Sequence, residues 1–188
     1  MRNRKRFIIL LSALLSFSCV SFGKPIEVIY LIPANFTGGV IIIYNQPDGI
    51  TPETTKDGTI IFQIPKDGLI KVKEPLERTA YKFSYYFVDE KGNRTPIEYL
   101  YPKHSVKNPG GTTSRNMNEV TENESNNKIF ALNHTTSNFG EERQKTYIYS
   151  FLIEKPAIAL QAFIQTEDRI FIIQEELLKK QAPTTKQE

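Results

Sequence analysis

The run Val40-Ile41-Ile42-Ile43-Tyr44 decides the fold class, because four consecutive β-branched residues are followed directly by an aromatic one. A strand with one solvent-exposed face alternates apolar and polar residues, whereas a strand covered on both faces is apolar throughout. β-Branched and aromatic side chains also favour extended structure over helix. The run therefore predicts a strand in a sheet that carries other protein layers on both sides.

Further strand patterns flank this run. They are expected at 27–32, 59–64, 69–72, 81–87, 95–101, 128–133 and 145–153. In 81–87 an aromatic residue occupies every second position, and the polar turn 89–93 follows, which together predict a β-hairpin with 95–101. The aromatic face of 81–87 is expected in the core. The glycine-rich segment 35–39 predicts a bulged hairpin loop between the first two strands.

The remaining segments define the domain organisation. Residues 105–127 are dominated by Asn, Ser, Thr, Gly and Glu, and such a stretch buries too little apolar surface to offset the entropy of ordering it. We expect a disordered polar loop there. Residues 156–181 favour one or two helices, and 182–188 form a polar tail. The strands joined by Pro and Gly turns predict a mainly β protein, an antiparallel β-sandwich spanning 24–155 with a C-terminal helix or helices.

Residues 1–23 have the pattern of a signal peptide. Four basic residues precede an apolar run from Phe7 to Phe17. As a helix this run would be roughly 16 Å long, about half the hydrocarbon thickness of a bilayer. A run too short to span, behind a cationic start, predicts export rather than a transmembrane anchor.

Two processing sites are compatible with this segment. Ser21-Phe22-Gly23 places small residues where ordinary signal peptidase requires them, immediately before Lys24. Leu15-Ser16-Phe17-Ser18-Cys19 resembles a bacterial lipobox, in which the cysteine receives a diacylglycerol and becomes the new N-terminus. Cys19 is the only cysteine of the chain, so no intramolecular disulfide explains it. The sequence favours lipidation at Cys19, hence a membrane partner and a place in the cell envelope or outer membrane. A periplasmic or secreted soluble protein is the alternative.

The net positive charge of the chain comes from the basic residues of its targeting segment. The full sequence has 24 basic and 21 acidic residues, a net charge of +3. Removal of Arg2, Arg4, Lys5 and Arg6 leaves 20 basic residues against 21 acidic ones, a net charge of −1. The mature chain therefore gives no electrostatic reason to expect a nucleic-acid partner.

Two motifs of the mature chain resemble a known family. They are Ile64-Pro65-Lys66-Asp67-Gly68-Leu69-Ile70 and, before it, Tyr30-Leu31-Ile32-Pro33-Ala34-Asn35-Phe36-Thr37-Gly38-Gly39-Val40. Together they resemble the domain-of-unknown-function family 6843, small exported bacterial proteins of which many are lipoproteins. The resemblance implies export and implies no activity, cofactor or site residue.

The residues that carry chemistry in enzymes form no recognisable pattern. The sequence has no P-loop, Rossmann fingerprint, nucleophile elbow, His-Glu-x-x-His or Cys-x-x-Cys motif. His104 and His134 are the only imidazoles, and both adjoin polar loops, where we expect them to be solvated. We expect the side chains of Glu141-Glu142 and Glu175-Glu176 to lie on solvent-exposed surfaces. We expect no catalytic residue, cofactor or metal, although a hydrolase whose two carboxylates come from distant strands stays open.

The expected function is therefore a non-enzymatic binding or structural module of the cell envelope, with a protein partner there. A secreted sandwich that binds carbohydrate or another ligand is the alternative, and it requires exposed aromatic side chains. The candidates for such a surface are Phe36, Tyr86, Tyr99 and Tyr101.

Overall fold

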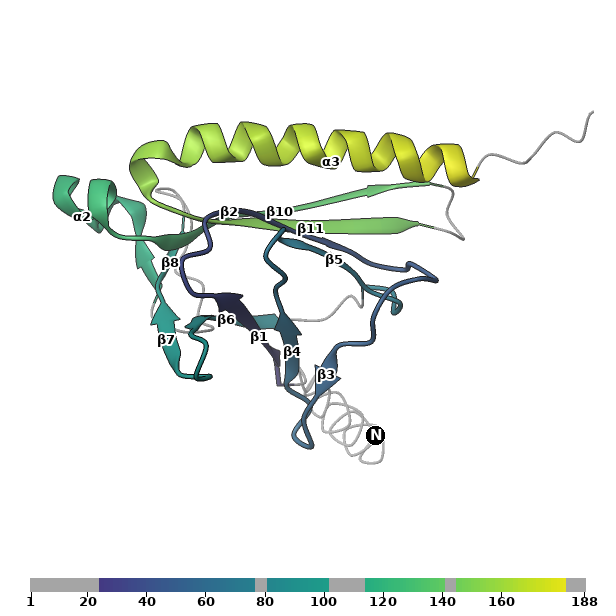
Figure 1. Cartoon of the computed structure of the whole chain (residues 1–188), viewed down its shortest axis with the longest axis horizontal. Coiled ribbons are helices and arrows are strands. Elements are labelled where there is room, and N and C mark those ends of the chain that lie inside the picture. The colour runs from purple at the N-terminus through teal and green to yellow at the C-terminus, as the bar shows by residue number, and fades with distance from the viewer. Residues whose placement is uncertain (1–23, 77–80, 102–113, 141–144, 182–188) are drawn as a thin grey trace, which may run out of the picture.

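Two β-sheets face each other across the main core, and one long helix lies on the outer side of the second sheet (Figure 1). The computed structural model describes residues 24–76, 81–101, 114–140 and 145–181. The first sheet has the strand order β3 (Glu53–Thr54), β4 (Ile60–Gln63), β1 (Ile26–Pro33), β6 (Tyr81–Val88), β7 (Arg94–Ile97). The second has the order β5 (Leu69–Lys71), β2 (Gly38–Ile43), β11 (Thr146–Glu154), β10 (Phe130–Phe139), β8 (Tyr99–Tyr101), β9 (Ser114–Asn116).

The apolar run from Val40 to Tyr44 forms most of β2 and is covered on both faces, as predicted. Val40 and Ile42 belong to the core between the sheets. Ile41 and Ile43 point the other way and pack with Ile170 and other residues of the long helix. This alternation fixes the layer order, because a single strand supplies side chains to both interfaces.

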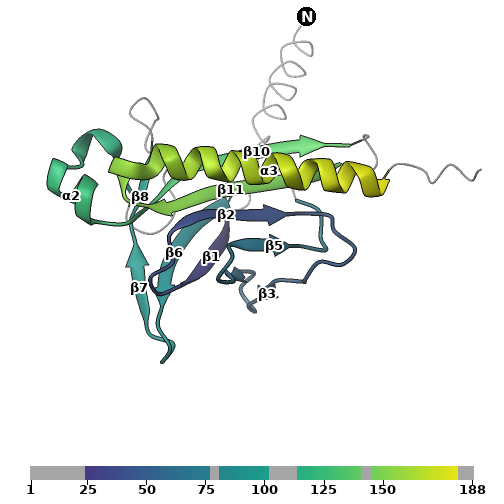
Figure 2. The same ribbon diagram turned by 45° about the horizontal axis from the view of Figure 1, so that its top comes forward.

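The long helix is α3 (Ala159–Gln181), which follows a short 3₁₀ helix at Pro156–Ile158. It lies along the second sheet and contacts β2, β11 and β10 (Figure 2). Gly39 of β2 is the point of closest approach: a Cβ atom there would lie 2.1 Å from Oγ1 of Thr166. No helix among the described residues is long and apolar enough to cross a bilayer.

The sheets are mixed, so the prediction of an antiparallel sandwich was correct in its mainly β class and wrong in strand direction. β1 runs parallel to both β4 and β6, and β2 runs parallel to β5. The expected hairpin across 35–39 is also wrong, because β1 and β2 lie in different sheets. The hairpin between 81–87 and the following strand is present as β6 and β7. The predicted strand 95–101 is divided, because β8 belongs to the second sheet.

The polar stretch predicted to be disordered carries secondary structure from Ser114 onward. β9 pairs with β8, a 3₁₀ helix spans Met117–Glu119, and α2 spans Glu122–Asn127. Thr121 and Glu124 form a reciprocal capping box at the start of α2, which supplies partners for amides that the first turn leaves unbonded. Polar side-chain bonding orders this segment together with Met117 and Val120, which pack against the hydrophobic cluster around Phe130.

An ion-pair network holds the same segment against the second sheet. Arg115 lies 2.8 Å from a carboxylate oxygen of Glu124 and 3.2 Å from one of Glu98. Lys128 lies 2.9 Å from the other oxygen of Glu98. Residues 102–113 of the predicted loop lie outside the described part of the chain. So do the signal segment 1–23 with Cys19, the tail 182–188, His104 and Glu141-Glu142.

Candidate functional site

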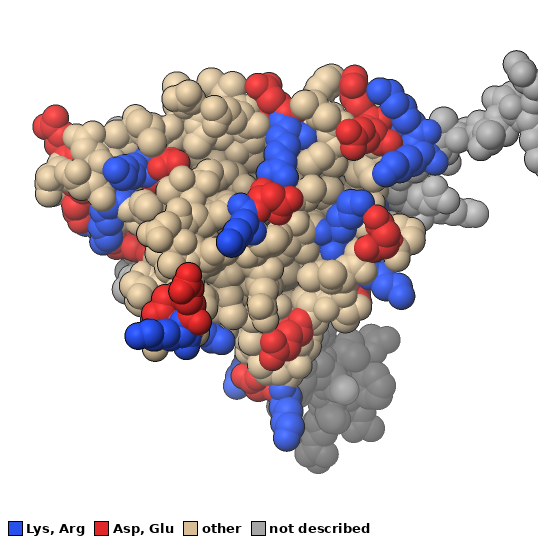
Figure 3. All heavy atoms as spheres, viewed as in Figure 1, with Lys and Arg blue, Asp and Glu red and all other residues tan. Residues whose placement is uncertain are grey.

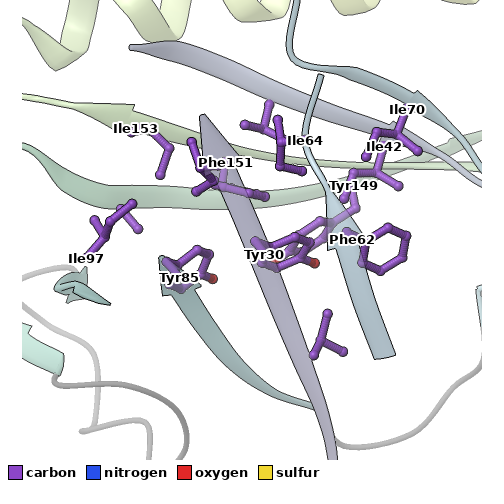
Figure 4. Packing of buried hydrophobic residues seen from close by; sticks show 14 of the residues in the cluster. Tyr30, Ile42, Phe62, Ile64, Ile70, Tyr85, Ile97, Tyr149, Phe151 and Ile153 are labelled. Atoms are coloured by element: carbon purple, nitrogen blue, oxygen red, sulfur yellow. The ribbon is translucent and has the colours of Figure 1, made fainter. Parts of the chain in front are cut away.

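A ladder of aromatic rings crosses the first sheet on the side that faces the core. Tyr30 of β1 is paired in register with Phe62 of β4 and with Tyr85 of β6. The ring centroid of Tyr30 lies 5.5 Å from that of Phe62 and 5.4 Å from that of Tyr85, and both pairs are stacked. Figure 4 shows the three rings in a row, with Tyr149 and Phe151 of β11 approaching from the opposite sheet. In-register parallel strands produce such a row, because equivalent side chains of neighbouring strands point to the same face.

Beside this ladder a cavity of about 580 Å³, partly open to solvent, lies between the two sheets. Its first wall is the next register row of the first sheet, Val28, Ile60 and Phe83. Tyr147 and Tyr149 of β11 form part of the wall opposite. Its size falls within the range of small-molecule sites, and its lining is mostly aromatic and aliphatic, as in such sites.

Glu74 supplies the one carboxylate among the described residues that line the cavity. Its backbone carbonyl accepts a hydrogen bond from the Asn45 amide at 3.0 Å, which fixes its place just after β5. The Thr51 hydroxyl donates to Oε1 of Glu74 at 2.7 Å. Oε2 is buried and has no hydrogen-bond partner among the described residues. A buried carboxylate oxygen without a donor is unusual, because it has lost its water and gained nothing in exchange.

The tyrosine hydroxyls around the cavity are held in the protonated form. Burial raises the pKa of Tyr30, Tyr44 and Tyr149 well above the ordinary value, and the other tyrosines nearby raise it further. The Tyr149 hydroxyl is buried and has no hydrogen-bond partner of normal geometry among the described residues. These groups can therefore donate or accept hydrogen bonds, and they do not act as bases at neutral pH.

His134 lies inside the aromatic core, so the prediction that it is solvated was wrong. Its ring stacks on Tyr99 at 4.4 Å, and the Tyr85 hydroxyl shares a hydrogen bond of 2.5 Å with Nε2. Burial lowers the pKa of His134 to about 3, so the imidazole is uncharged at neutral pH. The reason is a bulge in β10: the pairing with β11 shifts between Leu132 and Thr135, and Asn133 adopts a positive φ of 49°.

The four aromatic residues proposed from the sequence as a binding surface do not form one. Tyr101 is buried, and Tyr99 packs inward against His134. Phe36 is half-buried and lies against Gly68, where an added Cβ would be 3.0 Å from its ring. Tyr86 is half-buried on β6. The surface view in Figure 3 shows acidic and basic side chains interspersed, with no large field of one sign.

Sequence reasoning missed the cavity because its lining comes from residues as far apart as Val28 and Tyr149. The alternation in 81–87 and in 145–153 marks the contributing faces, and the spacing carries no sign that a space remains between them. Glu74 lies in the sequence between Lys73 and Pro75 without any motif. No cluster of three potential metal ligands occurs in the part of the chain that the structure describes. Glu175 belongs to one of the two glutamate pairs that we expected to be solvated. It lies exposed on α3, where it forms an ion pair with Lys179.

Comparison with known proteins places the chain in a family. No curated protein matches it. One similar solved structure is that of a Bacillus anthracis protein provisionally named a lipoprotein. The two share 18% sequence identity over 68% of this chain and 69% of the other, with a TM-score of 0.44. The sequence model of DUF6843, a family of unknown function, matches residues 26–143. This range includes the two sequence motifs that resemble the family and most strands of the two sheets. The chain therefore belongs to the family of unknown function DUF6843.

Proposed function

We propose that this protein is a non-enzymatic binding module of the cell envelope, exported and lipid-anchored through Cys19, whose inter-sheet cavity holds a small, mainly apolar ligand. The observation that carries the binding function is the cavity of about 580 Å³ with its aromatic lining. Export and anchoring rest on the cationic start, the short apolar run and the position of Cys19.

The chemistry of the lining favours an apolar ligand over a carbohydrate. The described lining includes seven aromatic residues, of which five are tyrosines, and its other polar side chains are three threonines and one carboxylate. A sugar presents a hydroxyl on most carbons and needs a partner for each one that it buries. An apolar body needs only shape and ring contact, which this cavity offers.

A binding role also agrees better with the titratable groups than hydrolysis does. The glycosidase arrangement requires two carboxylates that flank the scissile bond. Glu74 alone faces the cavity among the described residues, and the raised pKa of Tyr30, Tyr44 and Tyr149 keeps their hydroxyls from acting as bases.

The test is the binding of N-phenyl-1-naphthylamine, a neutral probe whose fluorescence rises in apolar surroundings. The exported chain carrying Cys19→Ser removes the lipid, and with it any need for detergent that would compete for the cavity. We expect saturable binding to this protein. The added variant Thr136→Trp should abolish it, because Thr136 lies at the cavity and is exposed enough for the larger ring to be accepted without unfolding.

Thr95→Trp is the matched control, since Thr95 is an exposed strand residue on β7 and does not line this cavity. It should bind the probe as well as its parent does. Absence of binding in the parent, or equal binding in Thr136→Trp, would contradict the proposed function.

A further inference from the structure

Among the described residues that line the cavity, one side chain is charged. Glu74 brings a negative charge, and no lysine or arginine is among the described lining residues. The remaining polar side chains are hydroxyls, whose oxygens can accept hydrogen bonds. This carboxylate would repel an anionic ligand, and no basic side chain among the described lining residues offsets the repulsion.

The Glu74 carboxylate is fixed and incompletely bonded. The Thr51 hydroxyl and the Asn45 amide hold its side chain and its backbone. The Val72 amide donates to the Ile43 carbonyl at 2.7 Å, so the segment leading to Glu74 continues the pairing of β5 with β2. Oε2 is out of contact with solvent and has no donor among the described residues, so the carboxylate acts on a ligand in the cavity through its charge and not through a hydrogen bond to this oxygen.

The aromatic residues favour the same kind of ligand. Tyr44, Tyr81 and Tyr147 line the cavity together with the ring of Phe83 and the ladder ring of Phe62. The face of an aromatic ring carries a negative quadrupole potential, so a ring that turns its face to the cavity attracts an organic cation.

We propose that the ligand is an organic ammonium compound, with its apolar body against the aromatic rings and its positive charge at the carboxylate of Glu74. This inference rests on the proposed function, since it names the chemical class of the ligand for the same cavity. An ammonium head would offset the one charge found among the described lining residues.

The test compares two probes of nearly identical shape, phenyltrimethylammonium and tert-butylbenzene, which differ in charge. Each is titrated into the Cys19→Ser chain, and displacement of N-phenyl-1-naphthylamine reports binding. We expect phenyltrimethylammonium to bind about tenfold or more tightly than the neutral probe, as contact with several rings and a carboxylate implies.

Glu74→Gln separates the charge from the shape. Gln retains an oxygen that accepts from Thr51, so the fold should persist, which the melting temperature checks. This variant should lose about tenfold in affinity for phenyltrimethylammonium and bind tert-butylbenzene within about twofold of its parent. Glu53→Gln is the control, because Glu53 on neighbouring β3 is exposed and outside the described lining, so it removes a nearby charge without contact.

The outcomes distinguish the two proposals. Equal or tighter binding of tert-butylbenzene, or an unchanged preference in Glu74→Gln, would overturn the ammonium inference and leave the binding function standing. Failure of N-phenyl-1-naphthylamine and of both smaller probes to bind would overturn the proposed function and this inference with it.

Discussion

Gly39 shows how one residue sets the distance between two layers. A Cβ atom at this position would lie 2.1 Å from Oγ1 and 2.6 Å from Cγ2 of Thr166, far inside contact distance. The Thr166 hydroxyl donates to the Ala162 carbonyl at 2.7 Å, so this side chain is held and cannot turn away without loss. The absence of a side chain at Gly39 is therefore what lets α3 lie so close to β2.

Gly39→Ala should consequently destabilise the protein by about 2 kcal/mol, the usual cost of forcing extra volume into a packed interface. Urea unfolding at neutral pH measures the change. Thr166→Ala removes the two nearest clashing atoms, so the double variant should recover a clear part of the loss relative to the sum of the single changes. Strict additivity of the two substitutions would show that the contact is not the cause.

His134 makes stability depend on pH. Its pKa in the folded protein is lowered to about 3 from an ordinary value of 6.5, and burial is the cause. Below about pH 6.5 the imidazole of His134 is therefore protonated in the unfolded chain, whereas in the folded chain it stays neutral. The stability associated with neutral His134 is complete above that pH and is lost progressively as the pH falls toward 3.

His134→Gln should remove this dependence, since the Gln amide can either accept from or donate to the Tyr85 hydroxyl. Between pH 7.5 and pH 5.5 we expect the parent to lose about 1 kcal/mol more stability than the variant. This window lies above the range in which ordinary carboxylates titrate, so acidic groups do not obscure the comparison. Parallel stability curves for the two proteins, measured by urea midpoints, would contradict the assignment.

At the scale of elements, α3 is the clearest case of a pattern that the sequence left ambiguous. Apolar residues occur on two sides of this helix. One stripe is buried and includes Ala159, Ala162, Ile170 and Leu177. The other is exposed and consists of Leu160, Ile164, Phe171 and Leu178. The helical spacing in the sequence is correct for both, and the stripe with small residues faces the sheet because it permits the close approach at Gly39.

Two neighbouring residues of α3 should therefore respond differently to the same substitution. Ile170 is 5% exposed and packs against β2, whereas Phe171 is 61% exposed. Ile170→Ala should cost about 2–4 kcal/mol of stability, and Phe171→Ala should change it by about 0.5 kcal/mol or less. Thermal and urea unfolding of the two variants give the comparison. A larger loss for Phe171→Ala would mean that the exposed stripe is covered in solution.

Strand existence could be read from the sequence, and strand pairing could not. Periodicity located β2, β6 and β11 because each has a local signature of apolar or alternating residues. The partner of a strand depends on chain segments far away: β1 lies between β4 and β6, and the short loop at 35–39 carries the chain to the other sheet. A glycine-rich connection is equally compatible with a hairpin and with a change of sheet. The glycine content of 35–39 therefore could not distinguish the two, and the predicted hairpin was wrong.

At the scale of the whole molecule, the candidate site escaped prediction for the same reason. The cavity exists only when Val28, Phe83 and Tyr147 come together from three strands in two sheets. The orientation of His134 likewise depends on a bulge that no periodicity indicated. Local patterns predicted which faces are apolar, and the space between those faces is a property of the assembled sheets.

The targeting segment, in contrast, is a matter of sequence alone, and its two processing sites make opposite predictions. If Cys19 is lipidated, the mature chain begins there with an acylated cysteine. Cys19→Ser should then abolish fatty-acid labelling and detergent partitioning, while Gly23→Leu should leave both intact.

If ordinary signal peptidase acts instead, cleavage follows Gly23. Gly23→Leu would then accumulate precursor, because that enzyme requires a small residue immediately before the cut, and Cys19→Ser would change nothing. Expression in a bacterium with the lipoprotein pathway, radiolabelled palmitate and the intact mass of the mature protein decide between the two. We expect the first pattern, since lipidation explains why the only cysteine of the chain, which has no disulfide partner within it, lies just after the apolar run. A labelled chain in Cys19→Ser, or an unlabelled parent whose N-terminus is Lys24, would exclude the anchor and make the protein a soluble exported one.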